Sequence, residues 1–513
     1  MRLDAGHEIE HATDATVRGC PQQTLHVWEE ESTVPTFRST NPARPAEIVI
    51  ELPEHTAADV DVAVQKAGDA QRAWAARPVP ERAEAVAAVG AVLVARKAEL
   101  AELVSREAGK VRIEGGGEVQ EAIDMAAFVA GQGRSAWGDV VPSEMPDKLA
   151  WTTRIPVGVV GMITPWNFPM AIPSWKIFPA LLAGNGVVMK PSELAPACGV
   201  AFVDACVEAG IPADLVQVVH GGPEPAAALA THPGVGAVSF TGSVPTGRKV
   251  ASAAMAVGPK LVSLELGGKN AMVVLDDADL DLVIDGALFG AFGTSGQRCT
   301  STSRLILQKG IAAEVVTRLV ERARALVLGD PLDPGTDIGP IIDARSADRI
   351  VAMAQAAVAE GATVATGGAK RTDIDGCEGG AFVEPTILTG VKPSHTIARE
   401  EVFGPVLSVI EVDDLDEAVA VVNSVEYGLS AAVYTRDLNA ALRGVHAIDT
   451  GITYVNAPTI GAEIPLPFGG TKHTGNGFRE AGARGIEQFS QVKTVYVDYS
   501  GRLQRAQIDN REA

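Results

Sequence analysis

The stretch GAVSFTGSVPTG at residues 236–247 decides the fold class. Its apolar first half predicts a short buried strand, and the Thr-Gly-Ser turn before Pro predicts the start of a helix. The same order recurs upstream, where GVVMK at residues 186–190 and VQVV at residues 216–219 are each followed by turn residues and a helical run. This β-α-β repetition predicts a mostly parallel sheet that helices cover on both faces.

A second alternating set of strands and helices follows the first. It begins with the apolar run AMVVL at residues 271–275 and continues to about Tyr454. Gly267 and Gly268 lie between the two sets and predict a hinge between two α/β domains. After the second set, residues 492–499 (VKTVYVDY) follow a strand-like alternation, which predicts one further strand.

The part of the chain before the first sheet is mainly helical in pattern. Across residues 57–108, apolar side chains recur at helical spacing. Gly109 and the glycine cluster at residues 115–117 end this run, so two or more helices are expected there. Residues 1–33 are polar and acidic without a clear period, and we expect them to form a poorly ordered N-terminal extension.

Length and composition restrict the class of protein. A chain of 513 residues is long enough for two or three domains. The 43 basic and 64 acidic side chains give a net charge of −21, which argues against nucleic acid or an anionic membrane as a partner. The sequence contains neither an apolar run of about 18 residues nor the apolar core of a signal peptide, so we expect a cytoplasmic protein.

The cysteines point to one reactive thiol rather than to a disulfide framework. Five cysteines in so long a chain are too few for such a framework, and none has metal-ligand spacing with histidines, so no metal is expected. Cys198 and Cys206 lie in an Ala-rich helical stretch, where small buried thiols are common. Cys299 differs, because small polar residues follow it in GQRCTS at residues 296–301.

Cys299 and Glu265 together supply a two-step acyl chemistry. A thiolate attacks a carbonyl carbon, and a carboxylate later activates water to release the acyl group. Glu265 lies in LELGGKN at residues 264–270, where two leucines flank it and predict a raised pKa suited to a general base. The nucleophile needs a lowered pKa, and an inward-pointing Arg298 would favour its thiolate.

Asn167 is the candidate for stabilising the intermediate. It lies in TPWNFP at residues 164–169, where two prolines stiffen the backbone around it. An Asx turn would also explain an asparagine here. We favour an oxyanion donor, in which its side-chain N–H and the backbone N–H of Cys299 hold the oxygen of the tetrahedral intermediate.

Taken together, these segments resemble the NAD(P)-dependent aldehyde dehydrogenase superfamily. The resemblance extends from about Thr40 to about Tyr499. It implies that Cys299 is the nucleophile, that Asn167 holds the oxyanion and that Glu265 activates the hydrolytic water. The remaining matching segments are KPSE at 190–193, FTGSVPTG at 240–247, EVFGP at 401–405 and PFGGTKHTGNG at 467–477.

The resemblance also implies the architecture: two parallel-sheet α/β domains, one Rossmann-like for the cofactor and one catalytic, with a β oligomerisation arm. The NAD-binding domain is expected at residues 34–136 and 158–266, and the catalytic domain at residues 267–487. Residues 137–157 and 488–503 would form the arm. In the family such an arm adds to the sheet of a neighbouring subunit, so a homodimer or homotetramer is expected.

The cofactor motif is not the usual one. At residues 184–186 (GNG) a strand follows and the third glycine of Gly-x-Gly-x-x-Gly is missing. Residues 240–247 instead end a strand and open a helix, whose N–H groups and dipole suit a pyrophosphate. By resemblance, Lys190 contacts the adenosine ribose and Glu193 accepts from its 2′- and 3′-hydroxyls. A carboxylate there repels a 2′-phosphate, so NAD is expected over NADP, although some family members accept both.

By the same resemblance, Glu401 holds the nicotinamide ribose beside Phe403. The full set of expected cofactor contacts is Thr164, Trp166, Lys190, Ser192, Glu193, Gly222, Phe240, Thr241, Gly242, Ser243, Thr246, Leu266, Glu401 and Phe403.

The resemblance implies that the substrate is a small-molecule aldehyde. The residues expected to line its site are Met170, Ile172, Trp175, Arg298 and Thr300. Residues 458–463 (PTIGAE) and 297–300 (QRCT) look similar to branches that act on carboxylated semialdehydes, such as the aminoadipic and 2-oxoglutaric ones. A broad-specificity aliphatic or aromatic aldehyde dehydrogenase is the alternative.

Two further alternatives lie within the superfamily. A CoA-acylating enzyme is disfavoured because such members generally lack a base at the position of Glu265. A catalytically silent structural member is disfavoured because Cys299 and Asn167 are retained. Thr474 in place of Ser, and Phe478 before Arg-Glu, depart from the family pattern and leave the details of the substrate loop open.

Overall fold

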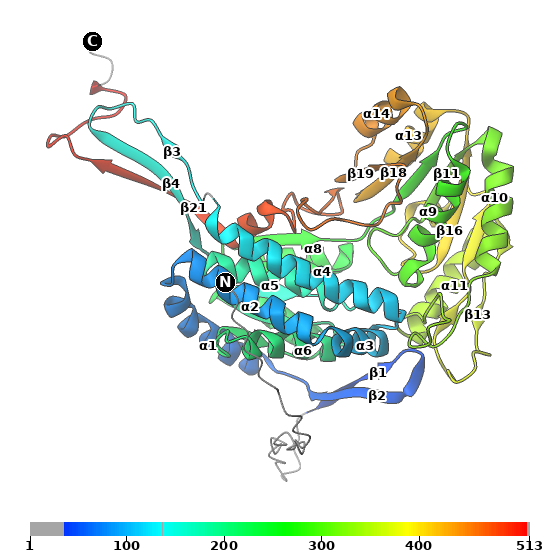
Figure 1. Cartoon of the computed structure of the whole chain (residues 1–513), viewed down its shortest axis with the longest axis horizontal. Helices are drawn as coiled ribbons and strands as arrows, with labels where there is room; N and C mark the ends of the chain where they lie inside the picture. Colours follow the sequence, from blue (N-terminus) through cyan, green and yellow to red (C-terminus); the bar gives the residue numbers. More distant parts are fainter. Residues whose placement is uncertain (1–34, 136, 510–513) are drawn as a thin grey trace, which may run out of the picture. The chain divides into compact units, whose positions relative to one another are not determined.

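The computed structural model describes residues 35–135 and 137–509 (Figure 1). The predicted N-terminal extension, residues 1–33, lies outside the described residues. Within the described part, the residues from Thr36 onward form one compact unit. Among those residues, no helix combines the length and the apolar character that crossing a membrane requires.

The first large sheet has five strands, and all its neighbouring pairs are parallel. Across the sheet they are β7 (Val216–Val218), β6 (Gly186–Lys190), β5 (Val159–Ile163), β8 (Val235–Thr241) and β9 (Leu261–Glu265). The chain runs outward from β5 through β6 to β7 and then returns to β8 on the other side. The carboxyl ends of β5 and β8 therefore flank a switch point, where open α/β sheets bind ligands.

Eight helices cover the two faces of this sheet. They are α1 (Ala57–Ala75), α2 (Val79–Ala95), α3 (Lys97–Ala108), α4 (Arg112–Gly131), α5 (Ala171–Ala183), α6 (Pro196–Glu208), α7 (Pro223–Thr231) and α8 (Val244–Ala256). Helices α2 to α6 pack on one face with Val187 and Met189, whereas α1, α7 and α8 pack on the other face with Val188. This alternation along β6 confirms the predicted sheet with helices on both sides.

The glycine cluster at residues 115–117 is the exception to the predicted helix ends. It does not break the chain but lies inside α4. A Cβ on Gly115 would come within 2.7 Å of the Ala101 carbonyl oxygen in α3. The small residue therefore lets the two helices pack closely, and Gly109 alone ends α3 in the left-handed conformation.

The second large sheet has seven strands, and only its edge strand β12 is antiparallel. Across the sheet they are β12 (Thr363–Thr366), β15 (Thr386–Thr389), β16 (Val406–Val412), β11 (Arg304–Gln308), β10 (Ala271–Val274), β18 (Ser430–Tyr434) and β19 (Ile452–Val455). Its helices are α9 (Leu280–Phe292), α10 (Lys309–Arg324), α11 (Ala344–Ala359), α12 (Thr396–Arg399), α13 (Leu415–Asn423) and α14 (Leu438–Ala447). Gly267 and Gly268 connect β9 to β10, and so join the two sheets.

The predicted late strand is β21 (Ser490–Asp498), which pairs antiparallel with β4 (Lys148–Pro156). With β3 (Val140–Val141) these strands form a three-stranded sheet (Figure 1). The remaining strands pair in twos: β1 (Thr36–Asn41) with β2 (Arg44–Pro53), β13 (Lys370–Arg371) with β14 (Phe382–Val383), and β17 (Tyr427–Gly428) with β20 (Thr471–Lys472). Short 3₁₀ turns lie at Gln132–Arg134, Gly293–Gly296 and Ala483–Phe489.

Candidate active site

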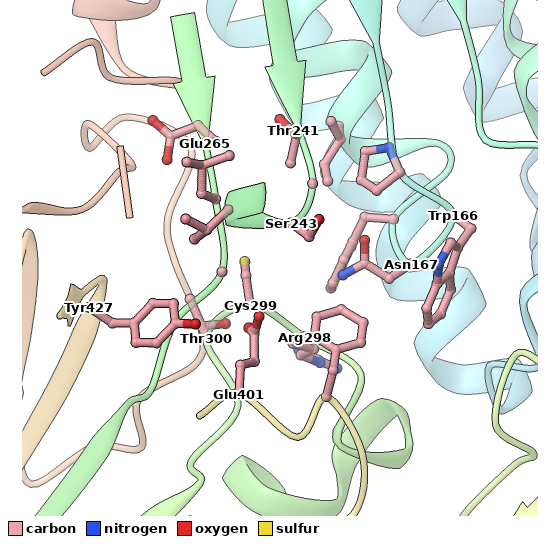
Figure 2. A pocket seen from close by; sticks show the side chains of 18 of the residues that line it. Trp166, Asn167, Thr241, Ser243, Glu265, Arg298, Cys299, Thr300, Glu401 and Tyr427 are labelled. Carbon is pink, nitrogen blue, oxygen red and sulfur yellow. The ribbon is translucent and has the colours of Figure 1, made fainter. Parts of the chain in front are cut away.

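A cavity of about 1150 Å³ lies at the carboxyl edge of the five-stranded sheet. It is lined by residues that follow β5, β8 and β9 and by the loop that carries Cys299. Figure 2 shows the Cys299 thiol and the side-chain amide of Asn167 pointing into this space. Glu265 lines the same cavity, so the three residues predicted to share one chemistry meet at one place.

The backbone before Cys299 is held in an unusual conformation. Thr294 and Ser295 have φ values of 53° and 54°, although neither is glycine. The Thr294 N–H donates to Glu114 (2.7 Å), and the Ser295 hydroxyl donates to the Gly339 carbonyl (2.8 Å). Such left-handed residues persist only where surrounding contacts fix them, and they concentrate at functional sites.

The carbonyl side of Cys299 is fixed as well. The Asn270 side chain donates from Nδ2 to the carbonyl oxygens of Cys299 (2.7 Å) and Ser301 (2.9 Å). A Cβ on Gly268 would come within 2.6 Å of the Cys299 carbonyl oxygen, so only glycine allows this approach. The nucleophile loop is therefore clamped from the strand connection between the two sheets.

The predicted lowering of the Cys299 pKa is wrong for this structure. Burial, with the Glu401 and Glu265 carboxylates nearby, raises the pKa of Cys299 to about 12. Arg298 does not offset them, because its guanidinium donates to Thr294 Oγ1 (2.9 Å) and to Glu114 (3.3 Å). The thiol is accordingly protonated until a base or a positive charge acts on it.

Asn167 lines the cavity together with Cys299, and its predicted role as an oxyanion donor stays a prediction. Its Nδ2 donates to the Gln297 carbonyl oxygen at 3.0 Å, and the side chain is 5 % exposed. A side-chain amide nitrogen carries two N–H groups, so one remains for the cavity. The Gln297 contact fixes the amide two residues before Cys299.

Glu265 ends β9 and is 3 % exposed. Neither of its carboxyl oxygens has a hydrogen-bond partner within the described residues. Burial, reinforced by the Glu480 carboxylate, raises the pKa of Glu265 well above its ordinary value, while Lys176 and Arg479 oppose the shift. The raised pKa agrees with the expectation for Glu265, and its role as a general base stays a prediction.

Lys176 and Glu480 were missed by the sequence analysis. They form a fully buried ion pair, in which the Lys176 ammonium also donates to Ser239 Oγ at 2.8 Å. A lone lysine in the otherwise apolar helix α5 is the signal that would have found Lys176. Glu480 had no such signal, because its partner lies 304 residues away in sequence.

Glu401 is a second buried carboxylate at the cavity. Burial raises the pKa of Glu401 to about 7, although the Gly268 N–H donates to it at 2.9 Å. A Cβ on Gly267 would lie 2.1 Å from its Oε2, so Gly267 makes room for it. Next to it, Phe403 has a φ of 54° and packs edge-on against Trp166 at 5.5 Å between ring centroids.

The predicted cofactor residues divide into two groups. Those that line the cavity are Trp166, Thr241, Gly242, Ser243, Leu266, Glu401 and Phe403. The others lie outside it, at or just after the carboxyl ends of strands β5, β6 and β8 or at the start of α7 and α8: Thr164, Lys190, Ser192, Glu193, Gly222, Phe240 and Thr246. Lys190 pairs with Glu193 at 3.2 Å. Both groups follow the same sheet edge, and their roles stay a prediction.

Four of the five predicted substrate residues line the cavity: Ile172, Trp175, Arg298 and Thr300. Met170 does not. Its side chain is fully buried in the core of the first sheet, and its backbone N–H donates to Glu118 (2.7 Å) at the start of α5. Trp175 packs against Phe468 with ring centroids 5.0 Å apart, and the two rings form an aromatic part of the cavity wall.

Comparison with known proteins agrees with this geometry. The sequence profile of the aldehyde dehydrogenase family matches residues 28–495. The chain belongs to the aldehyde dehydrogenase family. Alpha-ketoglutaric semialdehyde dehydrogenase of Bacillus subtilis is 39 % identical over 92 % of this chain and 96 % of that protein. Betaine aldehyde dehydrogenase of Rhizobium etli is 39 % identical over 91 % of this chain and 95 % of its own length.

Solved aldehyde dehydrogenase structures share the fold. The NAD-dependent aldehyde dehydrogenase from Sinorhizobium meliloti superposes with a TM-score of 0.88 at 38 % identity, covering 92 % of this chain and 93 % of that one. The aldehyde dehydrogenase match includes both large sheets and every cavity residue described above. Identity alone does not separate the semialdehyde relatives from the betaine aldehyde relatives.

Proposed function

We propose that this enzyme oxidises an aldehyde to its carboxylic acid with NAD, through a covalent acyl intermediate on Cys299. The observation that carries the proposal is that Cys299, Asn167 and Glu265 face one cavity beside the N-terminal turn of α8. Each residue type at that place supplies one step of acyl transfer: a nucleophile, an oxyanion donor and a base.

The steps follow from the positions of the side chains. Cys299 attacks the carbonyl carbon, and the free N–H of Asn167 with the backbone N–H of Cys299 stabilises the oxygen of the thiohemiacetal. When bound, NAD would supply a positive charge and the acceptor for the hydride that leaves the thiohemiacetal carbon; loss of that hydride and of the hydroxyl proton leaves a thioester on Cys299. Glu265 then takes a proton from water, which hydrolyses the thioester. Because both oxygens of Glu265 lack partners in the described residues, the carboxylate is free to hold that water.

The residues present fit a dinucleotide. Helix α8 begins at Val244 without a side-chain cap, so its first N–H groups remain available for a pyrophosphate. Glu401 accepts from Gly268 through Oε1, which leaves Oε2 to accept from a ribose hydroxyl. Glu193 is half exposed beside Lys190, where a carboxylate disfavours the 2′-phosphate of NADP.

A carboxylated semialdehyde is the substrate class that we favour within this proposal. Its support is the presence of Arg298 in the cavity wall and the 39–40 % identity to alpha-ketoglutaric semialdehyde dehydrogenases. The similar identity to betaine aldehyde dehydrogenases keeps a broader aldehyde specificity as the second candidate.

The reaction is tested by following the absorbance of NADH at about 340 nm, where the indole groups of the protein do not interfere. The panel should contain aliphatic and aromatic aldehydes, betaine aldehyde and semialdehydes, each with NAD or NADP. We expect turnover that Cys299→Ala abolishes, with more activity on NAD than on NADP. Turnover that requires CoA would indicate the acylating alternative, and no turnover on any aldehyde would overturn the proposal.

Assembly and location belong to the same proposal. The three-stranded arm exposes Val140, Val492 and Tyr496, which supports a homodimer or homotetramer built through this sheet. Light scattering of the purified chain measures its oligomeric state directly.

All four cysteines within the described residues are free thiols, which supports a cytoplasmic enzyme. The sheet boundaries support the division into NAD-binding domain, catalytic domain and arm.

A further inference from the structure

One acidic side chain in the cavity wall has no role in the proposed reaction. Glu121 lies on α4 and lines the cavity together with Arg298 and Phe168. No hydrogen bond or ion pair reaches its carboxyl group from residues 35–135 or 137–509. A half-buried carboxyl group without a partner is uncommon, and in a cavity it is a candidate for ligand contact.

The cations around Glu121 already have partners of their own. Lys110 is buried and pairs with Glu118 at 2.6 Å. Arg298 pairs with Glu114 at 3.3 Å, and both cations lie over the ring of Phe168, at 3.4 Å and 5.5 Å from its centroid. In this cluster of Lys110, Arg298, Glu114 and Glu118, each cation is therefore already paired with a carboxylate.

Glu121 is the surplus charge of the cluster. Two cations and two paired carboxylates balance, so an ionised Glu121 leaves one negative charge facing the cavity. A protonated Glu121 leaves the cluster neutral and presents an O–H donor beside Arg298, whose guanidinium has N–H groups beyond those used for Thr294 and Glu114.

Both states of Glu121 are populated near neutral pH. Burial raises the pKa of Glu121 to about 7. Among the charged groups around it, Glu118 and Asp124 raise the pKa further, and Lys110 and Arg298 oppose them. The charge at this wall of the cavity consequently changes near neutral pH.

We propose that Glu121 is a specificity-determining residue that contacts the end of the substrate opposite the aldehyde group. As an acid it donates to a substrate carboxylate next to Arg298, and as a carboxylate it repels that group and attracts a cation. This inference rests on the proposed function and extends it: the preference between carboxylated and cationic aldehydes should depend on pH.

The test compares three aldehydes of similar length: glutaric semialdehyde, hexanal and trimethylammonio-butanal. Their own charges are constant from about pH 6 to about pH 8.5. For each pH, the kcat/KM of the charged aldehyde is divided by that of hexanal. The ionisation of Cys299 and Glu265 affects kcat/KM for all three substrates alike, so its effect cancels in this ratio.

We expect the ratio for glutaric semialdehyde to fall about tenfold with rising pH in the native enzyme, since one unit charge is added near the substrate. The ratio for the cationic aldehyde should rise. In Glu121→Gln both ratios should become flat. Asp124→Asn is the matched control: it neutralises an exposed acid of the same helix that does not line the cavity. Because Asp124 raises the pKa of Glu121, the pH at which both ratios change should move lower in this variant, while the changes themselves remain.

Equal slopes in the native enzyme and in Glu121→Gln, or flat ratios in the native enzyme, would overturn the inference and leave the proposed function intact. If Glu121→Gln does not fold, Glu121→Ala provides the same comparison. Absence of turnover on hexanal and on both charged aldehydes would instead overturn the proposed function, and this inference with it.

Discussion

Glu118 and Glu265 are both fully buried carboxylates, yet their surroundings are opposite. Glu118 accepts from the Lys110 ammonium (2.6 Å) and from the backbone N–H groups of Met170 (2.7 Å) and Ala171 (3.2 Å). The carboxyl oxygens of Glu265 accept from none of the described residues. The partners of Glu118 compensate its burial, whereas Glu265 is held in a position that costs stability.

The difference distinguishes a structural carboxylate, that of Glu118, from the carboxylate proposed as the base, that of Glu265. A carboxylate whose oxygens are all used cannot take up a proton without losing those contacts. One whose oxygens are free has a raised pKa and room for water, as a base requires. Burial alone therefore does not point to a base; burial without partners supports the role proposed for Glu265.

Glu265→Gln tests the reactive side of this comparison and should have the largest effect. We expect kcat to fall about 10²–10⁴-fold, which is the usual contribution of a positioned base. The free energy of unfolding at about pH 8 should stay equal or rise, because a neutral amide replaces an unpartnered carboxylate.

A rapid burst of NADH followed by slow turnover would show that Glu265→Gln still forms the acyl intermediate. Loss of the burst together with turnover would mean that Glu265 acts before deacylation, and the assigned role would be wrong. Urea unfolding of the same samples gives the stability comparison.

Glu118→Gln tests the structural side. Removing the charge leaves Lys110 buried at 2 % exposure without its partner, which costs about 3–5 kcal/mol of unfolding free energy. Urea denaturation followed by tryptophan fluorescence measures the loss.

The double variant Lys110→Met with Glu118→Gln is the control, because it removes the unpaired buried cation while the amide oxygen of Gln still accepts from the N–H groups of Met170 and Ala171, and much of the stability should return. A stable single variant would show that Glu118 contributes no more than a surface carboxylate, and the contrast with Glu265 would disappear.

The pH dependence of stability provides the smallest and most specific effect. The folded-state pKa of Glu265 is raised above its ordinary 4.5, so the folded protein keeps a proton that the unfolded chain releases. As pH rises above about 4.5, the native enzyme should lose stability relative to Glu265→Gln by at most ~1.4 kcal/mol per pH unit, levelling off above the raised pKa. A difference that stays constant with pH would mean that water or another group compensates the carboxylate.

Much of the fold could be predicted from local sequence. The strands at residues 186–190, 216–219 and 236–240 were found within one or two residues, because buried parallel strands are short apolar runs. The glycines at residues 115–117 misled the prediction, since their role is contact between two helices and not a turn. Packing of this kind is a property of two segments and cannot be read from one.

The site shows the same limit. Cys299, Asn167 and Glu265 have informative neighbours in sequence, and the structure brings them to one cavity. Arg298 was placed correctly in the wall, but its expected action on Cys299 was wrong, because Glu114 on a distant helix holds its guanidinium. Charge pairing depends on the tertiary fold, so sequence reasoning finds the reactive residue more readily than its electrostatic surroundings.

The pairing of β4 with β21 has a consequence for folding during synthesis on the ribosome. Arg154 and Ser490, which touch in the finished arm, are 336 residues apart. At typical synthesis rates the ribosome needs roughly 15–70 seconds to cover that distance. During this time one edge of β4 lacks its partner, and open strand edges recruit other strands. Within the described residues β21 is the last strand to be synthesised, and its pairing with β4 covers that edge.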